Sequence, residues 1–179
     1  MFAITARLLL RPGWVEDAPA LARTIGDAAI VRNLAHVPWP YTLADAAAFL
    51  TLPHAPQRPR FLIVLRDTAE LVGGIGLHGE DAPELGYWIA RAHWGRGLAS
   101  EAGRAVMDLA DASLRLPRIE SCHAVDNPAS GRVLAKLGFR PTGGVTERFS
   151  LGRGATMQVR AYARARAAAP VAAPQPIAA

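Results

Sequence analysis

Hydrophobic and polar positions follow two different periods along the chain, and this pattern predicts strands interleaved with helices. Short apolar runs typical of strands cover residues 5–10 and then, in close succession, residues 61–65, 71–77 and 85–90. The connections between the last three runs are short and turn-like. We therefore expect these three strands to pair as an antiparallel meander.

Helical patterns occupy the chain between the first strand and the meander. Asp17 opens a helix over residues 17–25 that has a proline in its first turn. Thr42 begins a capping-box pattern ahead of a short helix that runs through residue 50. Residues 53–59 are rich in proline and predict a loop.

The second half of the chain alternates between helices and strands. Apolar positions recur every three or four residues over 98–113, which predicts a helix of about four turns, and residues 119–125 form an apolar strand. A helix between two strands predicts a right-handed crossover that places those strands parallel. A further helix over 127–138 precedes a terminal hairpin of residues 139–149 and 156–162. The predicted fold class is α/β, with a mixed, mostly antiparallel sheet and flanking helices.

Composition is that of one globular domain. The 179 residues are 51% hydrophobic, which suits a single core over residues 1–163, and the Ala- and Pro-rich residues 164–179 are expected to be a disordered tail. We see neither a signal peptide nor an apolar stretch of about 18 residues, so we expect a cytoplasmic protein without a membrane partner. Cys122 is the single cysteine, which excludes a disulfide within the chain.

The net charge of +5 comes almost wholly from arginine. Arginine favours contact with phosphate or carboxylate, so the charge fits a phosphorylated cofactor, an acidic partner or nucleic acid. The arginines are scattered and lack the interleaved aromatic residues of a nucleic-acid stripe. We therefore expect no direct nucleic-acid binding, and we find no pattern that predicts a metal site.

The stretch HWGRGLASEAG at residues 93–103 joins a predicted strand to a predicted helix. A helix N-terminus carries free N–H groups and roughly half a positive charge. Gly95 and Gly97 let the backbone approach an anion closely, and Arg96 adds a fixed positive charge, which predicts a phosphate or diphosphate site. A plain turn is the alternative. The residues between the strand and the first glycine argue against a dinucleotide fingerprint, and the lysine of a P-loop is missing.

Several ordered motifs resemble the GCN5-related N-acetyltransferase (GNAT) family, and most closely its RimJ/RimL-type ribosomal-protein N-terminal acetyltransferase branch. The resemblance rests on WGRGLASEA from residue 94 and on DNPASGRVLAKLGF from residue 126. Additional matches are TARLLLR from residue 5, PYTLADA from residue 40 and ELGYWI from residue 84. Together these motifs cover nearly everything from Thr5 to about Tyr162.

The resemblance implies a sheet whose fourth and fifth strands splay apart, with acetyl-CoA in the gap as co-substrate. Amides of the glycine loop would hold the diphosphate, and backbone groups of the splayed strand would hold the pantetheine. Trp94 stands at the family's usual Arg or Gln position, so its side chain is expected to pack while the amides bind. Arg91 or Arg96 could reach the 3'-phosphate, and a solvated surface role is the alternative for each. The implied cofactor-binding residues are Tyr87, Ile89, Gly95, Arg96, Gly97, Leu98, Ala99, Ser100 and Asn127.

Catalysis in this family requires an oxyanion donor and an acid for the departing thiolate. The resemblance implies that a backbone N–H near Ile89 supplies the first. Ser130 matches the serine proposed as proton donor in the RimL branch, while Leu134 stands where many family members have a tyrosine. A serine in the first turn of a helix can also simply cap amides, and that alternative stays open.

Glu84 is our first candidate for the base that deprotonates the acceptor, with His78 and His36 behind it. At pH 7.5 roughly a third of an α-amine is already neutral, whereas a lysine amine is neutral only about one part in a thousand, so a missing strong base favours α-amines. His36, Trp39 and Tyr41 are candidate walls of the acceptor cleft. The acceptor stays open between a protein N-terminus, a small amine and an antibiotic. Two further questions also stay open: whether the chain is a non-catalytic acyl-CoA-binding module, and whether it forms a homodimer.

Overall fold

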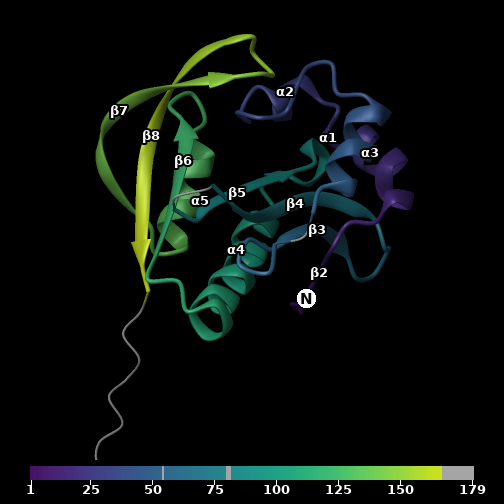
Figure 1. Ribbon diagram of the computed structural model, residues 1–179, viewed down its shortest axis with the longest axis horizontal. Coiled ribbons are helices and arrows are strands. Elements are labelled where there is room, and N and C mark those ends of the chain that lie inside the picture. The colour runs from purple at the N-terminus through teal and green to yellow at the C-terminus, as the bar shows by residue number, and fades with distance from the viewer. Residues whose placement is uncertain (54, 80–81, 167–179) are drawn as a thin grey trace, which may run out of the picture.

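A single mixed sheet organises the described part of the protein (Figure 1). The structure is a computed structural model and describes residues 1–53, 55–79 and 82–166. Its strand order is β1-β2-β3-β4-β5-β6-β8-β7, and the one parallel pair among the described strands is β5 with β6. The strands are β1 (Ala3–Ile4), β2 (Leu8–Arg11), β3 (Arg60–Leu65), β4 (Leu71–His78), β5 (Glu84–Ile89), β6 (Arg118–Ala124), β7 (Arg140–Ser150) and β8 (Ala155–Ala165).

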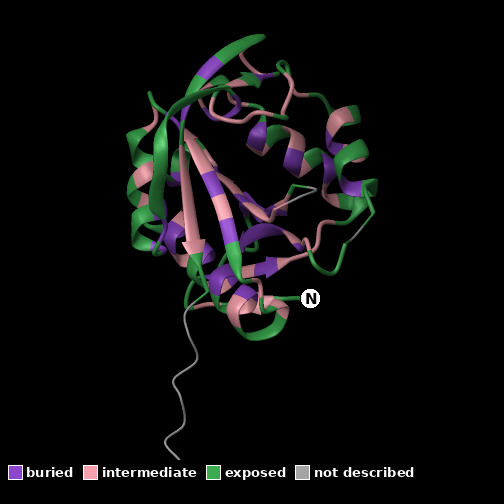
Figure 2. Ribbon diagram, turned by 60° about the vertical axis from the view of Figure 1, so that its left-hand side comes forward, coloured by how far each residue is buried: buried purple, intermediate pink, exposed green. Residues whose placement is uncertain are grey.

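Helices cover both faces of the sheet. Leu21, Leu50 and Leu62 belong to a core cluster between α1, α3 and one face, and a larger cluster lies under α4 and α5 on the other face. Figure 2 shows the buried residues on the central strands and on the inner sides of the helices. The helices are α1 (Ala18–Ile25), α2 (Ala28–Val31), α3 (Leu43–Thr51), α4 (Leu98–Leu109) and α5 (Pro128–Lys136), and the short turns are η1 (Val15–Asp17), η2 (Arg91–His93) and η3 (Ala110–Leu114).

The predicted order of elements is confirmed through most of the chain. β3, β4 and β5 form the antiparallel meander, and α4 connects β5 to the parallel strand β6. Thr42 caps α3 in the predicted capping box, and the Asn127 side chain accepts a hydrogen bond from a backbone amide at the start of α5. The α/β fold class with a mixed sheet is therefore confirmed.

Local structure differs from the expectation at three places. The strand predicted over residues 5–10 begins only at Leu8, because the chain turns at Thr5, whose N–H donates to the Leu8 carbonyl at 2.9 Å and whose hydroxyl donates to Glu101. The short helix α2 was not predicted; its first turn is capped by the Asp27 carboxylate, which accepts from the Ala29 N–H. β8 continues to Ala165, past residue 163, because it stays paired with Arg118 and Ile119 of β6. Residues 167–179 of the predicted tail lie outside the described residues.

The sheet is interrupted between β5 and β6. The two strands share a single register pair, Glu84 with Glu120, reinforced by a hydrogen bond from the Ser121 hydroxyl to the Leu85 carbonyl at 2.8 Å. Beyond this point the strands separate, and in Figure 1 β6 and β8 stand at a steep angle to β4 and β5. The expected splay is therefore present, and it opens the sheet for a ligand. Within the described residues, no helix is both long and apolar enough to cross a membrane.

Candidate active site

A cleft of about 1110 Å³ lies where β5 and β6 diverge, and it passes from one face of the sheet to the other. On the α4 and α5 face it is lined by the glycine loop and the start of α5, and on the α1 and α3 face by Gly86, Trp88 and Glu84 of β5. Successive side chains of a strand point to opposite faces. The cleft therefore presents two chemically different halves on one strand.

The free edge of β5 directs backbone groups into this cleft. The Ala90 N–H donates to the Val72 carbonyl at 2.8 Å, on the side of β4, whereas the Leu85 carbonyl accepts from β6. Backbone groups alternate in direction along a strand, so Tyr87 and Ile89 direct theirs to the same side as Leu85. These are the two residues predicted to hold pantetheine through the backbone.

The glycine loop presents uncapped amides at the start of α4. Gly95 and Gly97 have φ values of 76° and 77°, the left-handed region that favours glycine, and Gly97 is the N-cap of α4 without a side-chain cap. The first hydrogen bond of the helix runs from the Glu101 N–H to the Gly97 carbonyl at 3.1 Å. The N–H groups of Leu98, Ala99 and Ser100 precede it and therefore have no helical partner. These three residues, Gly95 and Gly97 all line the cleft.

The Arg96 side chain turns to a neighbour of the loop, and Arg96 is absent from the cleft lining. Its guanidinium lies 2.8 Å from the buried ring of His93, and its carbonyl accepts from Arg7 at 3.0 Å. Arg7 in turn pairs with Glu101 at 2.6 Å, which ties the N-terminal segment to the first turn of α4. Arg96 therefore stabilises the loop's shape in this structure.

Two cations on α5 were missed from the sequence. Arg132 and Lys136 are exposed, lie one helical turn apart and line the cleft. Arg91 lies 3.9 Å from Asp27 and does not line the cleft. The spacing of four residues on a helix already predicted to begin at Asn127 was the signal that could have identified this pair.

Trp94 makes a specific contact and is half-exposed in the cleft lining. Its indole N–H donates to the Ile89 carbonyl at 2.7 Å. This satisfies one of the backbone groups that β5 directs into the gap. The sequence predicted only that the Trp94 side chain packs, so this hydrogen bond is a structural role that the sequence did not reveal.

Ser130 and Tyr87 form a pair of hydroxyl groups on the α5 side of the gap. Their oxygens lie 2.7 Å apart, and the Tyr87 phenol also donates to the Ser130 carbonyl at 3.0 Å. Burial raises the pKa of Tyr87 to about 12, against a smaller opposing effect of the Ser130 hydrogen bond. The phenol therefore stays protonated at neutral pH. The Ser130 N–H meets the Asn127 side chain at 3.4 Å, so Asn127 acts here as the cap of α5.

Leu134 is fully buried in the core. The position at which many family members have a tyrosine is therefore occupied by packing, and Tyr87 brings a phenol to the cleft from β5 instead.

Glu84 lies on the opposite face, within a bidentate ion pair. Arg148 of β7 donates to its two carboxylate oxygens at 2.7 and 3.1 Å, and the Cys122 thiol lies 3.4 Å from one of them. Burial raises the pKa of Glu84, but the hydrogen bonds and charge of Arg148 outweigh burial and leave the pKa below its usual value. A carboxylate with both oxygens engaged is a weak proton acceptor, which counts against Glu84 as the base.

The two other candidate bases lie together at this face. The rings of His36 and His78 meet edge to face, with centroids 6.2 Å apart, and both line the cleft. Burial lowers the pKa of His78, and His36 and Arg148 add to this effect while Glu84 opposes it. Among the described residues, we find no three His, Cys, Asp or Glu side chains placed to hold a metal ion.

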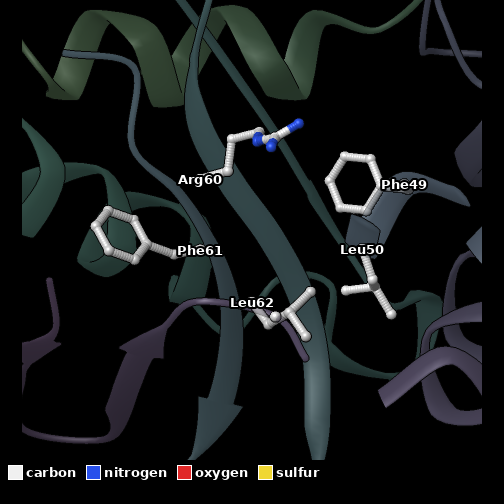
Figure 3. Close-up of a pocket in the computed structure, with 6 residues that line it drawn as sticks. Phe49, Leu50, Arg60, Phe61 and Leu62 are labelled. Carbon is white, nitrogen blue, oxygen red and sulfur yellow. The ribbon is translucent and has the colours of Figure 1, made fainter. Parts of the chain in front are cut away.

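The outer wall of this half combines aromatic side chains with a basic one. Tyr41, Phe49 and Arg60 line it, whereas Trp39 does not. Figure 3 shows Arg60 of β3 and Phe49 of α3 beside a small recess, and the guanidinium lies 5.4 Å from the centre of the Phe49 ring. Arg60 also donates to the Leu52 and Pro53 carbonyls at 2.9 and 2.8 Å. It therefore anchors the end of α3 at the mouth of the cleft.

Comparison with known proteins agrees with this architecture. A family model described as Acetyltransferase (GNAT) domain matches residues 7–140. The uncharacterized N-acetyltransferase YoaA of Bacillus subtilis (strain 168) is 33% identical over 154 residues, covering 80% of this chain and 86% of that protein. The uncharacterized N-acetyltransferase p20 of Bacillus licheniformis is 31% identical over 147 residues, covering 78% and 82%. The structure of RimL, a ribosomal L7/L12 alpha-N-protein acetyltransferase in complex with coenzyme A, has a TM-score of 0.77 at 22% identity, covering 93% and 98%.

Proposed function

Because the chain belongs to the GNAT family of acetyltransferases and is an N-acetyltransferase, we propose that it transfers the acetyl group of acetyl-CoA to a primary amine. The first candidate acceptor is a protein N-terminal α-amine. The observation that carries the proposal is the gap between β5 and β6, which places free strand backbone beside the uncapped amides of α4.

The residues of the cleft fit the chemical groups of coenzyme A. A diphosphate needs several convergent donors, and the amides from Gly95 to Ser100 surround a helix N-terminus without a side-chain cap. A pantetheine chain offers amide groups, and Tyr87 and Ile89 present strand backbone to the same gap. Arg132 and Lys136 supply positive charge for the remaining phosphate. Acetyl-CoA would bring an already activated acetyl thioester to this site.

The protein's own groups then have three tasks. A backbone N–H of β5 near Ile89 stabilises the oxyanion, because it points into the gap and is held by a rigid strand. Ser130 donates a hydrogen bond to the departing thiolate, with Tyr87 as its partner. Glu84, the base predicted from the sequence, holds Arg148 and shapes the acceptor side. The third task is to accept the proton of the attacking amine.

The α-amine is favoured by two considerations. RimL, whose fold is similar, is described as acting on an α-amine of a ribosomal protein. In addition, roughly a third of an α-amine is neutral near pH 7.5, so no strong base is required. A small-molecule amine is the alternative acceptor, since fold similarity does not define a substrate.

A thiol-release assay tests the proposal. The full chain is incubated with acetyl-CoA and a panel of peptides with free α-amines, peptides with lysine amines only, and small polyamines, and mass spectrometry identifies the acetylated product. We expect release that depends on an α-amine peptide. Binding of coenzyme A without release on any amine would reveal a non-catalytic binding module, and release on polyamines alone would move the acceptor to the small-molecule class.

A further inference from the structure

His78 occupies a space that β5 leaves open. Position 86, one residue before Tyr87, is a glycine, and a Cβ atom there would lie 2.8 Å from Nε2 and 3.2 Å from Cδ2 of His78. The imidazole therefore extends from the end of β4 across β5 towards the gap. In the described residues we find no hydrogen-bond partner for this ring, so a nitrogen lone pair is available in the cleft.

The position of this ring matches that of the hydroxyl pair on the other face. Tyr87 directs its phenol to Ser130 on the α5 side, while the imidazole of His78 lies over Gly86, the preceding residue, on the acceptor side. Side chains on the two faces of one strand are separated only by the backbone. A thioester in the gap would therefore have hydroxyl donors on one side and His78 on the other.

We propose that His78 is the base that receives the proton of the acceptor amine, and that the acceptor is a weakly basic amine of the α-amine type. This inference rests on the proposed function and adds to it a catalytic residue and a limit on the substrate class.

The surroundings of His78 keep it neutral and therefore able to accept a proton. Burial is the main reason that its pKa lies below the ordinary value of 6.5, so the uncharged ring predominates at pH 7. The charged and titratable groups that face it are Glu84 on β5, His36 after α2 and Arg148 on β7, and only Glu84 favours the protonated ring. Glu84 is itself neutralised by Arg148, so its effect on His78 is limited.

A base of this kind selects among amines by their acidity. An α-ammonium has a pKa of about 7.7 to 8.0 and a lysine ammonium one of about 10.4, so near pH 7.5 the lysine amine is neutral roughly 300-fold less often. A weakly basic imidazole cannot compensate for such a difference. His78 therefore suits α-amines and other amines of low basicity, and disfavours lysine side chains.

The reaction balances without another reactant. The amine nitrogen forms a bond to the thioester carbonyl carbon, the bond from that carbon to sulfur breaks, and the electron pair leaves with the sulfur. His78 takes one proton from the attacking nitrogen and passes it to water. The thiolate is stabilised by Ser130 and is protonated from solvent.

Steady-state kinetics of the full chain across pH 5.5 to 9 test the inference, with two acceptors. One is a short peptide with a free α-amino group, and the other is the same peptide with that group blocked and one lysine side chain supplied. We expect His78→Asn to lower kcat/KM for the first peptide about 100-fold and to leave the KM for acetyl-CoA unchanged. Below the pKa of His78 it should reduce the slope of the acid limb of log kcat/KM from two to one, because only the ionisation of the α-amine, at about 7.7 to 8.0, then remains. At pH 7.5 we expect the wild type to prefer the first peptide by at least about 100-fold.

Three further variants separate catalysis from folding. Gly86→Ala places a methyl group against the imidazole and should lower kcat/KM at least about tenfold, whereas Gly143→Ala, whose Cβ meets nothing within 4 Å, should match the wild type. His36→Asn removes a group that lowers the pKa of His78, so it should move the steeper part of the acid limb, which His78 causes, to higher pH without removing it.

The inference is overturned if His78→Asn stays within threefold of the wild type, if its acid limb is as steep as that of the wild type, or if the lysine peptide is acetylated equally well. Failure of the wild type on every amine in the panel would instead overturn the proposed function.

Discussion

Replacing Ser130 by alanine removes the hydroxyl that faces the gap 2.7 Å from the Tyr87 phenol. A phenol has a single hydrogen. If Tyr87 donates it to the Ser130 oxygen, the serine hydrogen is free to point at the departing sulfur. If Tyr87 donates it to the Ser130 carbonyl, the serine hydrogen is drawn back to the phenol. The two residues therefore determine each other's orientation, and their kinetic effects should be coupled.

The magnitude follows from the acidities. A thiol has a pKa of about 8.5 and the pKa of Tyr87 is about 12, so full proton transfer to the thiolate is uphill by more than three units. Ser130 therefore contributes a hydrogen bond to a developing charge, worth about 1.5 to 3 kcal/mol. That range corresponds to a loss of roughly 10- to 150-fold in kcat for Ser130→Ala. Tyr87→Phe removes a neutral hydrogen bond and should cost about 2- to 10-fold.

Single-turnover thiol release is the appropriate assay, because it excludes product release from the measured rate. We expect the double variant to be no slower than Ser130→Ala alone, since Tyr87 acts through the serine. Ser113→Ala makes the same change at an exposed serine outside the cleft lining and should leave the rate unchanged. Additive losses in the double variant, or a Ser130→Ala rate within threefold of the wild type, would refute the coupled pair.

Two other predictions concern the cofactor loop and the acceptor side. Gly97→Ala forces a side chain into a left-handed conformation at about 1 to 2 kcal/mol, so the Kd for coenzyme A in calorimetry should rise about 5- to 30-fold, while Gly143→Ala leaves it unchanged. Arg148→Met removes the partner of Glu84, whose folded pKa lies below its ordinary 4.5. The ion pair therefore contributes its full stabilisation of the folded state above the pKa that Glu84 has in the unfolded chain. This contribution is lost as the pH falls through the pKa of Glu84 in the folded protein. The variant's deficit in unfolding free energy, about 1 to 2 kcal/mol at pH 7, should therefore shrink at pH 3, and a deficit independent of pH would show that the pair is not its cause.

Local signals in the sequence predicted the elements well because those signals act over a few residues. The capping box at Thr42, the cap at Asn127 and the apolar spacing of α4 each operate within a turn or two of helix. The turn at Thr5 was missed because part of what holds it is distant. Thr5 and Arg7 bind Glu101, and nothing in residues 5–10 reveals a partner nearly a hundred positions away.

The same distinction applies to the site. The glycine loop could be identified from adjacent residues, whereas the environment of Glu84 depends on Arg148, 64 positions away on a strand that the sequence placed only in a hairpin. Without that contact, Glu84 at the start of a splayed strand suggests a base. With it, the carboxylate is occupied, and the neighbouring His78 becomes the group with a free lone pair.

Trp94 shows how a departure from the family pattern alters the roles of backbone groups. Its indole binds the Ile89 carbonyl and takes one of that oxygen's two lone pairs, so the carbonyl has less capacity left for a pantetheine amide. The proposed cofactor recognition along β5 then rests more on the Ile89 N–H and on the backbone of Tyr87. A hydrogen bond on the carbonyl side of Ile89 also restricts rotation of that residue, which fixes the direction of its N–H. Trp94, which replaces the family's Arg or Gln, therefore orients the proposed oxyanion donor. The amides of α4 can hold a diphosphate without an anion-binding side chain at position 94.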